Sequence, residues 1–124
     1  MLTASISTAI VLTGQSLAGV ATITDGEVIQ VSNEVASNNT SEVLALAFDK
    51  TKLKALYVNS NIACNISFGA GNPALVMTAG CPYVWHSLSQ FAVPFANNCA
   101  AATVANNNAS TNVTVDIVAV IDPS

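Results

Sequence analysis

The alternation that decides the fold lies in residues 112–122, "NVTVDIVAVID". Five apolar residues occupy every second position of this stretch: Val113, Val115, Ile117, Ala119 and Ile121. Successive side chains of a β-strand point to opposite faces, so these five would share one face. The stretch therefore predicts a strand with one face in a hydrophobic core.

The same two-residue period recurs along the chain in short segments separated by polar or glycine-containing turns. A run that is apolar at nearly every position, residues 42–48, predicts a central strand covered on both faces. Turns are predicted at residues 13–19, 24–27, 36–41 and 69–73. The other predicted strands are residues 2–12, 20–24, 29–35, 55–60, 62–68, 74–79 and the first part of 100–108.

Roughly eight to ten short strands at this spacing predict an all-β protein. We expect a single antiparallel β-sandwich domain over residues 1–124, jelly-roll-like in its topology. At most one short helical turn is expected, near residues 49–55, because Asp49 is a good N-cap.

Charge is scarce in this chain. Charged residues make up 8% of it and apolar residues 52%, whereas about a quarter of an ordinary soluble domain is charged. The net charge is −4, and the basic residues are Lys50, Lys52 and Lys54. A chain without a basic footprint is not expected to bind nucleic acid or an anionic membrane. The composition instead favours a protein with much of its surface covered by partner proteins.

The first 24 residues contain no Lys or Arg, and polar residues interrupt their apolar positions. A secretory leader needs a basic start and an unbroken apolar stretch, and a membrane span needs about 18 apolar residues. We therefore expect no targeting segment, folding in the cytosol, and reduced cysteines.

The residues needed for catalysis or metal binding are not grouped in the sequence. His86 is the only histidine, and Asp49 or Asp116 could reach it only through the fold. The three cysteines, Cys64, Cys81 and Cys99, would complete a Cys₃His zinc set with His86, but none forms a short knuckle. We predict no catalytic residue, metal, cofactor or small-molecule substrate, and no enzyme activity.

Residues 79–95, "AGCPYVWHSLSQFAVPF", concentrate the aromatic residues. In a strand, Tyr83 and Trp85 would share a face, which could present a sugar-binding platform or pack into the core. Aromatic residues are also enriched at protein interfaces. The predicted interface residues are Tyr83, Trp85, His86, Phe91 and Phe95.

Five segments resemble the decoration, or cement, proteins of tailed bacteriophages. They are "TGQSLAGVATIT" (13–24), "LAFDKTKLKALYV" (46–58), "AGCPYVW" (79–85), "VPF" (93–95) and "VTVDIVAVIDP" (113–123). The resemblance implies a jelly-roll-like subunit that forms a homotrimer, bridges major capsid proteins and has no enzymatic role.

The function expected from the sequence is therefore that of a structural virion protein. It would be made in the host cytoplasm and would lie on the capsid surface. Its partners would be other copies of itself and a major capsid protein. The alternatives are another virion β-domain, either tail- or fibre-associated or a small capsid subunit, and a carbohydrate-binding or adhesin module that uses Tyr83 and Trp85.

Overall fold

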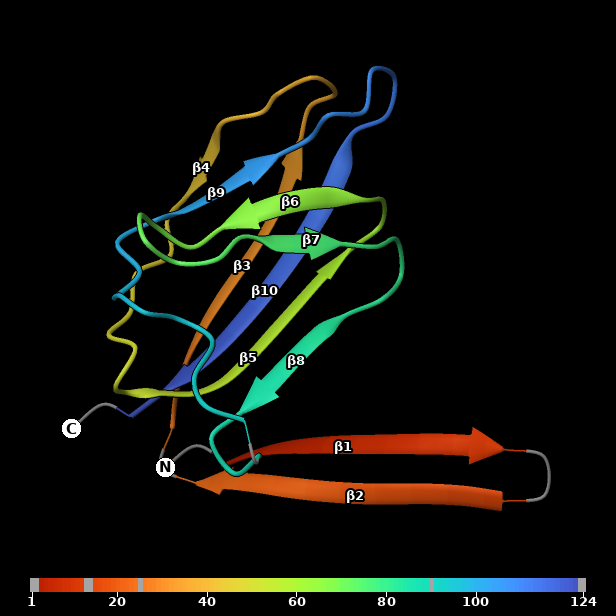
Figure 1. The fold of residues 1–124 in the computed structure, drawn as a ribbon, viewed down its shortest axis with the longest axis vertical. Coiled ribbons are helices and arrows are strands. Elements are labelled where there is room, and N and C mark those ends of the chain that lie inside the picture. Colours follow the sequence, from red (N-terminus) through yellow and green to blue (C-terminus); the bar gives the residue numbers. More distant parts are fainter. Residues whose placement is uncertain (1–2, 13–14, 25, 90, 123–124) are drawn as a thin grey trace.

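The computed structural model describes residues 3–12, 15–24, 26–89 and 91–122. These residues form ten β-strands and no helix, so the all-β prediction is confirmed. Figure 1 shows the strands as two packed layers with one hairpin extending from them. The strands are β1 (Thr3–Leu12), β2 (Gln15–Thr24), β3 (Glu27–Val35), β4 (Glu42–Leu44), β5 (Leu53–Ser60), β6 (Cys64–Ser67), β7 (Leu75–Met77), β8 (Tyr83–His86), β9 (Ala102–Ala105) and β10 (Val113–Ile121).

Two four-stranded antiparallel sheets make a β-sandwich, as predicted. The first sheet has the strand order β3-β10-β5-β8 and the second has the order β4-β9-β6-β7. The pairing is nested: β3 pairs with β10, β4 with β9, β5 with β8 and β6 with β7. The chain from β3 to β10 therefore behaves as one long antiparallel hairpin folded over into two layers.

The core lies between the inner faces of the two sheets. β10 runs between β3 and β5, and its predicted core face is buried from Val113 to Ala119. Burying one aliphatic side chain of this size is worth about 1.5–3 kcal/mol, so these alternating faces hold the layers together. The largest fully buried side chains are Phe68, Leu46, Leu56, Ile66, Ile117, Val35, Val58, Val104, Val113 and Val115.

Residues 42–48 are not a central strand covered on both faces, so that prediction was wrong. β4 lies at an edge of the second sheet, and the segment alternates between buried and exposed positions. Leu44, Leu46 and Phe48 are buried, whereas Val43 is 64% exposed. The small alanines between the buried residues made a half-buried segment look apolar throughout.

The predicted turn at residues 13–19 was too long. β2 already begins at Gln15 and pairs with β1, with Leu17 opposite Ile10 and Gly19 opposite Thr8. Ten cross-strand pairs outweigh the weak strand preference of one glycine. Residues 13–14 and Asp25, which belong to predicted turns, lie outside the described residues.

The short turn allowed for near residues 49–55 is present as a single turn. Lys52 N donates to Asp49 O at 3.0 Å, and β5 begins at the next residue. The Asp49 carboxylate accepts from Thr51 N at 2.9 Å and from Thr51 Oγ1 at 2.7 Å, which lowers its pKa. Asp49 therefore caps the turn as predicted, and no helix follows it, in agreement with the expectation of at most one helical turn.

The predicted turn at residues 69–73 is confirmed and packs on the loop around Asn97. Asn72 Nδ2 donates to Asn97 O at 3.1 Å, and Asn97 N donates to Asn72 Oδ1 at 2.8 Å. Gly71 has φ +82°, and a Cβ added there would collide with Asn97 Nδ2. This turn therefore needs glycine both for its backbone and for its contact.

Candidate assembly surface

The aromatic segment of residues 79–95 contributes mainly to the core. β8 is an edge strand of the first sheet, and Trp85 lies opposite Leu56 with 7% of its surface exposed. Trp85 Nε1 donates to Phe91 O at 3.1 Å, which holds the following loop over the indole. Tyr83 and Trp85 share a face, as predicted, but that face points into the sandwich and offers no open aromatic platform.

Phe95 is buried in the same core. It is 3% exposed, and its ring lies 5.5 Å from that of Phe48 and 5.1 Å from that of Phe68. Both pairs are tilted, at 52° and 47°, within the range that aromatic pairs prefer. Phe95 therefore joins the loop after β8 to the second sheet.

The tip of this loop is different, because two large apolar side chains lie on its surface. Phe91 is 79% exposed and Leu88 is 63% exposed. The loop is held by Ser89 Oγ, which donates to His86 O at 2.7 Å, and by Ser87 N, which donates to Lys54 O at 2.8 Å. A fixed loop that displays apolar side chains is suited to contact another protein.

His86 lies on the outer face of the first sheet, opposite Ala55. Its Nδ1 is buried and has no hydrogen-bond partner. Asp116 is not beside it, because Asp116 lies opposite Asn59 on β5, four residues from Ala55, and accepts a hydrogen bond from Ser32 Oγ at 2.6 Å. The structure therefore does not bring His86 and Asp116 together as an acid–base pair.

The cysteines are also apart. Cys64 and Cys99 are buried, and burial raises the pKa of each thiol, whereas Cys81 is exposed. Within the part of the chain that the structure describes, no three His, Cys, Asp or Glu side chains could together hold a metal ion. Over the same residues, no helix is long and apolar enough to cross a membrane.

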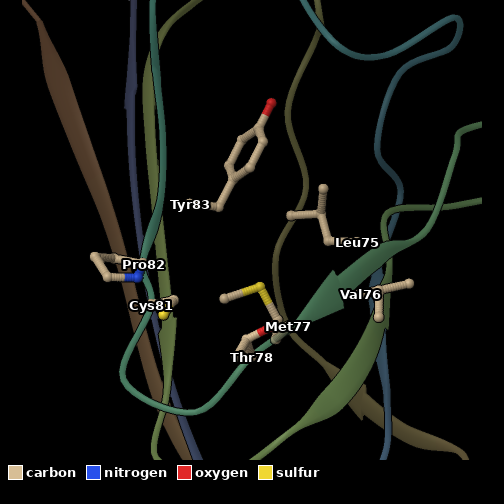
Figure 2. A pocket seen from close by; sticks show the side chains of 7 residues that line it. All are labelled: Leu75, Val76, Met77, Thr78, Cys81, Pro82 and Tyr83. Atoms are coloured by element: carbon tan, nitrogen blue, oxygen red, sulfur yellow. The ribbon is translucent and has the colours of Figure 1, made fainter.

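A small pocket opens where the two sheets meet at their edges, between β7 and β8. Its volume is about 220 Å³. Figure 2 shows Tyr83 and Leu75 on opposite sides of it, with Met77 between them. Burial raises the pKa of the Tyr83 hydroxyl. The lining residues are Leu75, Val76, Met77, Thr78, Cys81, Pro82 and Tyr83, so the pocket is mainly apolar.

The hairpin β1–β2, residues 3–12 and 15–24, is a two-stranded sheet of its own, and we call it the arm. Figure 1 shows it extending away from the two sheets. Residues 1–24 contain no Asp, Glu, Lys or Arg. Because an isolated two-stranded hairpin is marginally stable at best in water, an arm of this length calls for a further contact.

The outer face of the first sheet is apolar in one half. The register places Val28, Val120, Ala55 and His86 in one row across the four strands, and Gln30, Val118, Tyr57 and Val84 in the next. Neither row contains Asp, Glu, Lys or Arg. We call these two rows the apolar rows.

Two acidic residues, Glu34 of β3 and Asp116 of β10, lie in the other half of that face. Asp116 is bonded to Ser32, and Glu34 Oε1 accepts from Asn112 Nδ2 at 2.8 Å. Within the apolar rows, Val28, Tyr57 and Val84 are 41%, 38% and 42% exposed, whereas Val120 and Ala55 are buried. The outer face of this sheet therefore exposes apolar surface to water, and polar groups border that surface, as they do at assembly surfaces.

The arm, the apolar rows and the loop tip together form the candidate assembly surface. No family model, curated protein or solved structure matches this chain.

The five predicted interface residues are divided by the structure. Phe91 lies on the surface, His86 ends the first of the apolar rows, Tyr83 is half-buried beside the pocket, and Trp85 and Phe95 are in the core. Their role in an interface stays a prediction. The sequence analysis missed the apolar rows, because the register of β3, β10, β5 and β8 is needed to see that scattered residues are neighbours.

Proposed function

We propose that this protein is a structural virion component, a capsid decoration subunit that forms a homotrimer and bridges major capsid proteins. The observation that carries the proposal is the arm: a hairpin of two charge-free strands of 10 residues each, extending from a charge-poor sandwich. A hairpin of this kind is stable when it lies against another protein, so its presence points to an assembled state.

The nested strand pairing supports the same class of protein, a structural virion component. A jelly roll is an antiparallel sandwich of eight strands in two sheets, and it occurs in viral capsid domains as well as in lectins and cupins. The strand orders β3-β10-β5-β8 and β4-β9-β6-β7 agree with that topology. Because fold alone does not determine function, the arm and the exposed apolar surface carry more weight than the topology.

A subunit with few charged residues is also suited to a capsid shell. Many copies of one subunit lie close together on a capsid, and neutral surfaces avoid the self-repulsion that charged copies would accumulate. Contacts made only in the assembled shell then stabilise that shell by mass action. The role we propose is mechanical.

The contact with the shell is assigned to the loop tip. Leu88 and Phe91 are the two most exposed large apolar side chains of the loop, and the hydrogen bonds around Ser89 hold the loop in place. A preformed apolar contact loses little conformational entropy when it binds. The loop tip therefore serves as the capsid-binding element.

The test is co-sedimentation of the purified protein with empty shells of the major capsid protein encoded beside it. We expect binding and a higher melting temperature of the shells. Phe91→Ser should weaken binding about tenfold or more, because it removes one exposed anchor. Val43→Ser changes a 64% exposed valine on the second sheet and serves as the matched control.

Two outcomes would reject the proposal. One is the absence of capsid genes near the gene for this chain, and the other is a folded protein that leaves the shells unbound. If the protein associated with tails or fibres and not with shells, it would instead be a tail- or fibre-associated β-domain. Sugar binding through Tyr83 and Trp85 is disfavoured, because the indole of Trp85 is 7% exposed and bonded to Phe91 O.

A further inference from the structure

We infer that the free edge of β3 pairs with the same edge of a second copy of this chain, as two antiparallel strands related by a two-fold axis. The inference goes beyond the proposed function, because it holds for copies of this chain whether or not they bind a capsid. It leaves the contacts of the trimer to other surfaces. Its evidence is the length and regularity of the edge, the direction of its backbone groups, and the fit of the edge to itself.

β3 is the longest edge strand of the sandwich and has none of the features that block an edge. It has nine residues, whereas the other edge strands, β4, β7 and β8, have three, three and four. It contains no Lys, Arg or Pro, and it pairs with β10 over nine successive positions without a shift in register. Among the described residues, no strand pairs with its outer side. A long and regular edge of this kind is a template for another strand.

One hydrogen bond gives the direction of the backbone groups of β3. Asn61, just beyond β5, donates its N–H to Thr114 O at 3.2 Å, so the even-numbered residues of β10 direct their backbone groups toward β5. These groups alternate between the two sides of a strand, so the odd-numbered residues of β10 face β3. Since Ile117 lies opposite Val31, the odd-numbered residues of β3 face β10 in turn. The residues of β3 whose backbone groups point to the free edge are therefore Val28, Gln30, Ser32 and Glu34.

This edge is open to water in the single chain. The side chains of all four outward residues are exposed, and that of Val28 is 41% exposed. Four residues with one N–H and one C=O each give eight unpaired backbone groups along the edge. A partner that covers the edge without bonding these groups would bury them at a cost. The partner that suits them is an extended strand.

A second copy of β3 fits this edge, because the outward residues are placed symmetrically about Val31. In the antiparallel register that puts Val31 opposite Val31 of the partner, Val28 lies opposite Glu34 of the partner and Gln30 lies opposite Ser32 of the partner. Each outward N–H and C=O of one copy then faces an outward group of the other, so all eight are satisfied. The short edges of β4, β7 and β8 would leave part of β3 unpaired.

The same register separates the negative charges of the two copies. The acidic residues of β3 are Glu27 and Glu34, near its two ends, and the residues between them are uncharged. In the two-fold register Glu34 lies opposite Val28 of the partner, and Glu27 lies opposite Val35 of the partner. An in-register parallel pairing would instead put each glutamate beside its own copy, and like charges directly opposite are destabilising. Charge therefore favours the antiparallel arrangement.

The size of the contact sets its strength. Nine residues span about 30 Å at ~3.3 Å per residue, and a sheet layer is about 10 Å thick. Each copy then buries roughly 300 Å², well below the ~800 Å² per partner of a stable complex. The contact is therefore weak in dilute solution and becomes populated where copies are concentrated.

The first experiment measures amide hydrogen exchange of the full-length chain by NMR, at roughly 50 μM and 1 mM, with sedimentation velocity at both concentrations. The amides of the four outward residues should exchange about tenfold or more slowly in the concentrated sample. The amides of Ile29, Val31 and Asn33, which face β10, should be protected in both samples. Fast exchange of the outward amides in both samples overturns the inference. So does protection in a chain that sediments as a monomer, because the arm of the same chain would then cover the edge.

The second experiment blocks the edge. Gln30→Pro removes an outward N–H without removing a bond to β10. Val84→Pro is the matched control on the opposite edge: Ser87 N donates to Lys54 O at 2.8 Å, so the N–H of Val84 points away from β5. Gln30→Pro should weaken self-association about tenfold or more, and Val84→Pro should not. Circular dichroism shows whether each variant is folded, and Gln30→Lys serves if Gln30→Pro is not. Self-association that the Gln30 variants leave unchanged overturns the inference.

The third experiment tests the register by disulfide crosslinking, in chains that carry Cys81→Ser to remove the exposed thiol. Chains with Gln30→Cys are mixed with chains with Ser32→Cys, because directly opposite residues lie about 5.5 Å apart, within the reach of a disulfide. Mild oxidation should give several-fold more mixed dimer than either variant mixed with Val43→Cys, a 64% exposed site on the second sheet. No excess of the mixed dimer rejects the register. A chain that forms this dimer and never binds shells would reject the capsid function and leave the edge pairing intact.

Discussion

Asn106 provides the sharpest test of how the sandwich is held together. It follows β9, and its side chain is fully buried. The two hydrogens of Asn106 Nδ2 are shared among three carbonyls, Val35 O at 3.1 Å, Ala36 O at 3.2 Å and Thr111 O at 3.0 Å, and Oδ1 accepts from Asn108 N at 3.0 Å. One amide therefore joins the end of β3 to the loop that leads into β10.

The substitution Asn106→Ala removes all four hydrogen bonds. The bond to Val35 O is fully buried, and an unsatisfied buried carbonyl costs about 1–3 kcal/mol. The bonds to Ala36 O and Thr111 O are partly buried, and losing each costs about 1 kcal/mol net. The expected loss is roughly 3–5 kcal/mol, a large share of the 5–15 kcal/mol that stabilises a typical domain.

The assay is urea unfolding followed by the fluorescence of Trp85, at one fixed protein concentration. With an m-value of about 2 kcal/mol/M, the midpoint of Asn106→Ala should fall by about 2 M. Asn107→Ala, at the exposed neighbouring position, should change stability by no more than about 0.5 kcal/mol. A loss below about 1 kcal/mol in Asn106→Ala would refute the reasoning, because it would mean that water replaces the amide at no cost.

Three further predictions follow from single residues. In the folded protein a thiol reagent should modify the exposed Cys81 rapidly. It should modify Cys64 and Cys99 only after unfolding in urea, because burial shields these two thiols and raises their pKa values. Equal modification rates for all three cysteines would contradict this prediction. Burial raises the pKa of Tyr83, so the unfolded chain loses the phenolic proton first and the free energy of unfolding should fall as the pH rises through about 10. Tyr83→Phe should reduce that fall in alkaline urea titrations, and an unchanged alkaline limb would count against it. Gly71→Ala should lower the free energy of unfolding by about 1–2 kcal/mol in the same urea assay, because its φ is positive and its Cβ would meet an amide; a neutral result would show that the turn rearranges freely.

The fold class could be predicted because the core strands follow a two-residue period. Val113 to Ile121 lie in phase in the sequence and in the structure, and the inner positions from Val113 to Ala119 are buried. Residues 42–48 misled the prediction, since small alanines at exposed positions carry no signal of exposure. The length of β2 could not be predicted, because its strand character comes from pairing with β1.

The candidate assembly surface was harder to predict, for a reason that residues on β5 and β8 illustrate. Tyr57 and Val84 lie 27 positions apart in the sequence, yet the register makes them direct neighbours. The pairing of β8 with β5 also decides which face of β8 is covered. From the sequence alone, Trp85 could therefore belong either to an exposed sugar-binding platform or to the core. Local pattern predicts the elements, whereas the register between distant strands decides which side chains meet.

The nested pairing has a consequence for the order in which the chain can fold. β6 and β7 are close in sequence and can pair early, but β3 must wait for β10, which is synthesised after all the other strands of the sandwich. Glu27 and Ile121 are partners in that final pair. Contacts between such distant residues are slow to form, since closing a long loop costs entropy before any contact is gained. We therefore expect β3 to stay unpaired on the ribosome until β10 has emerged, and the sandwich to close only then.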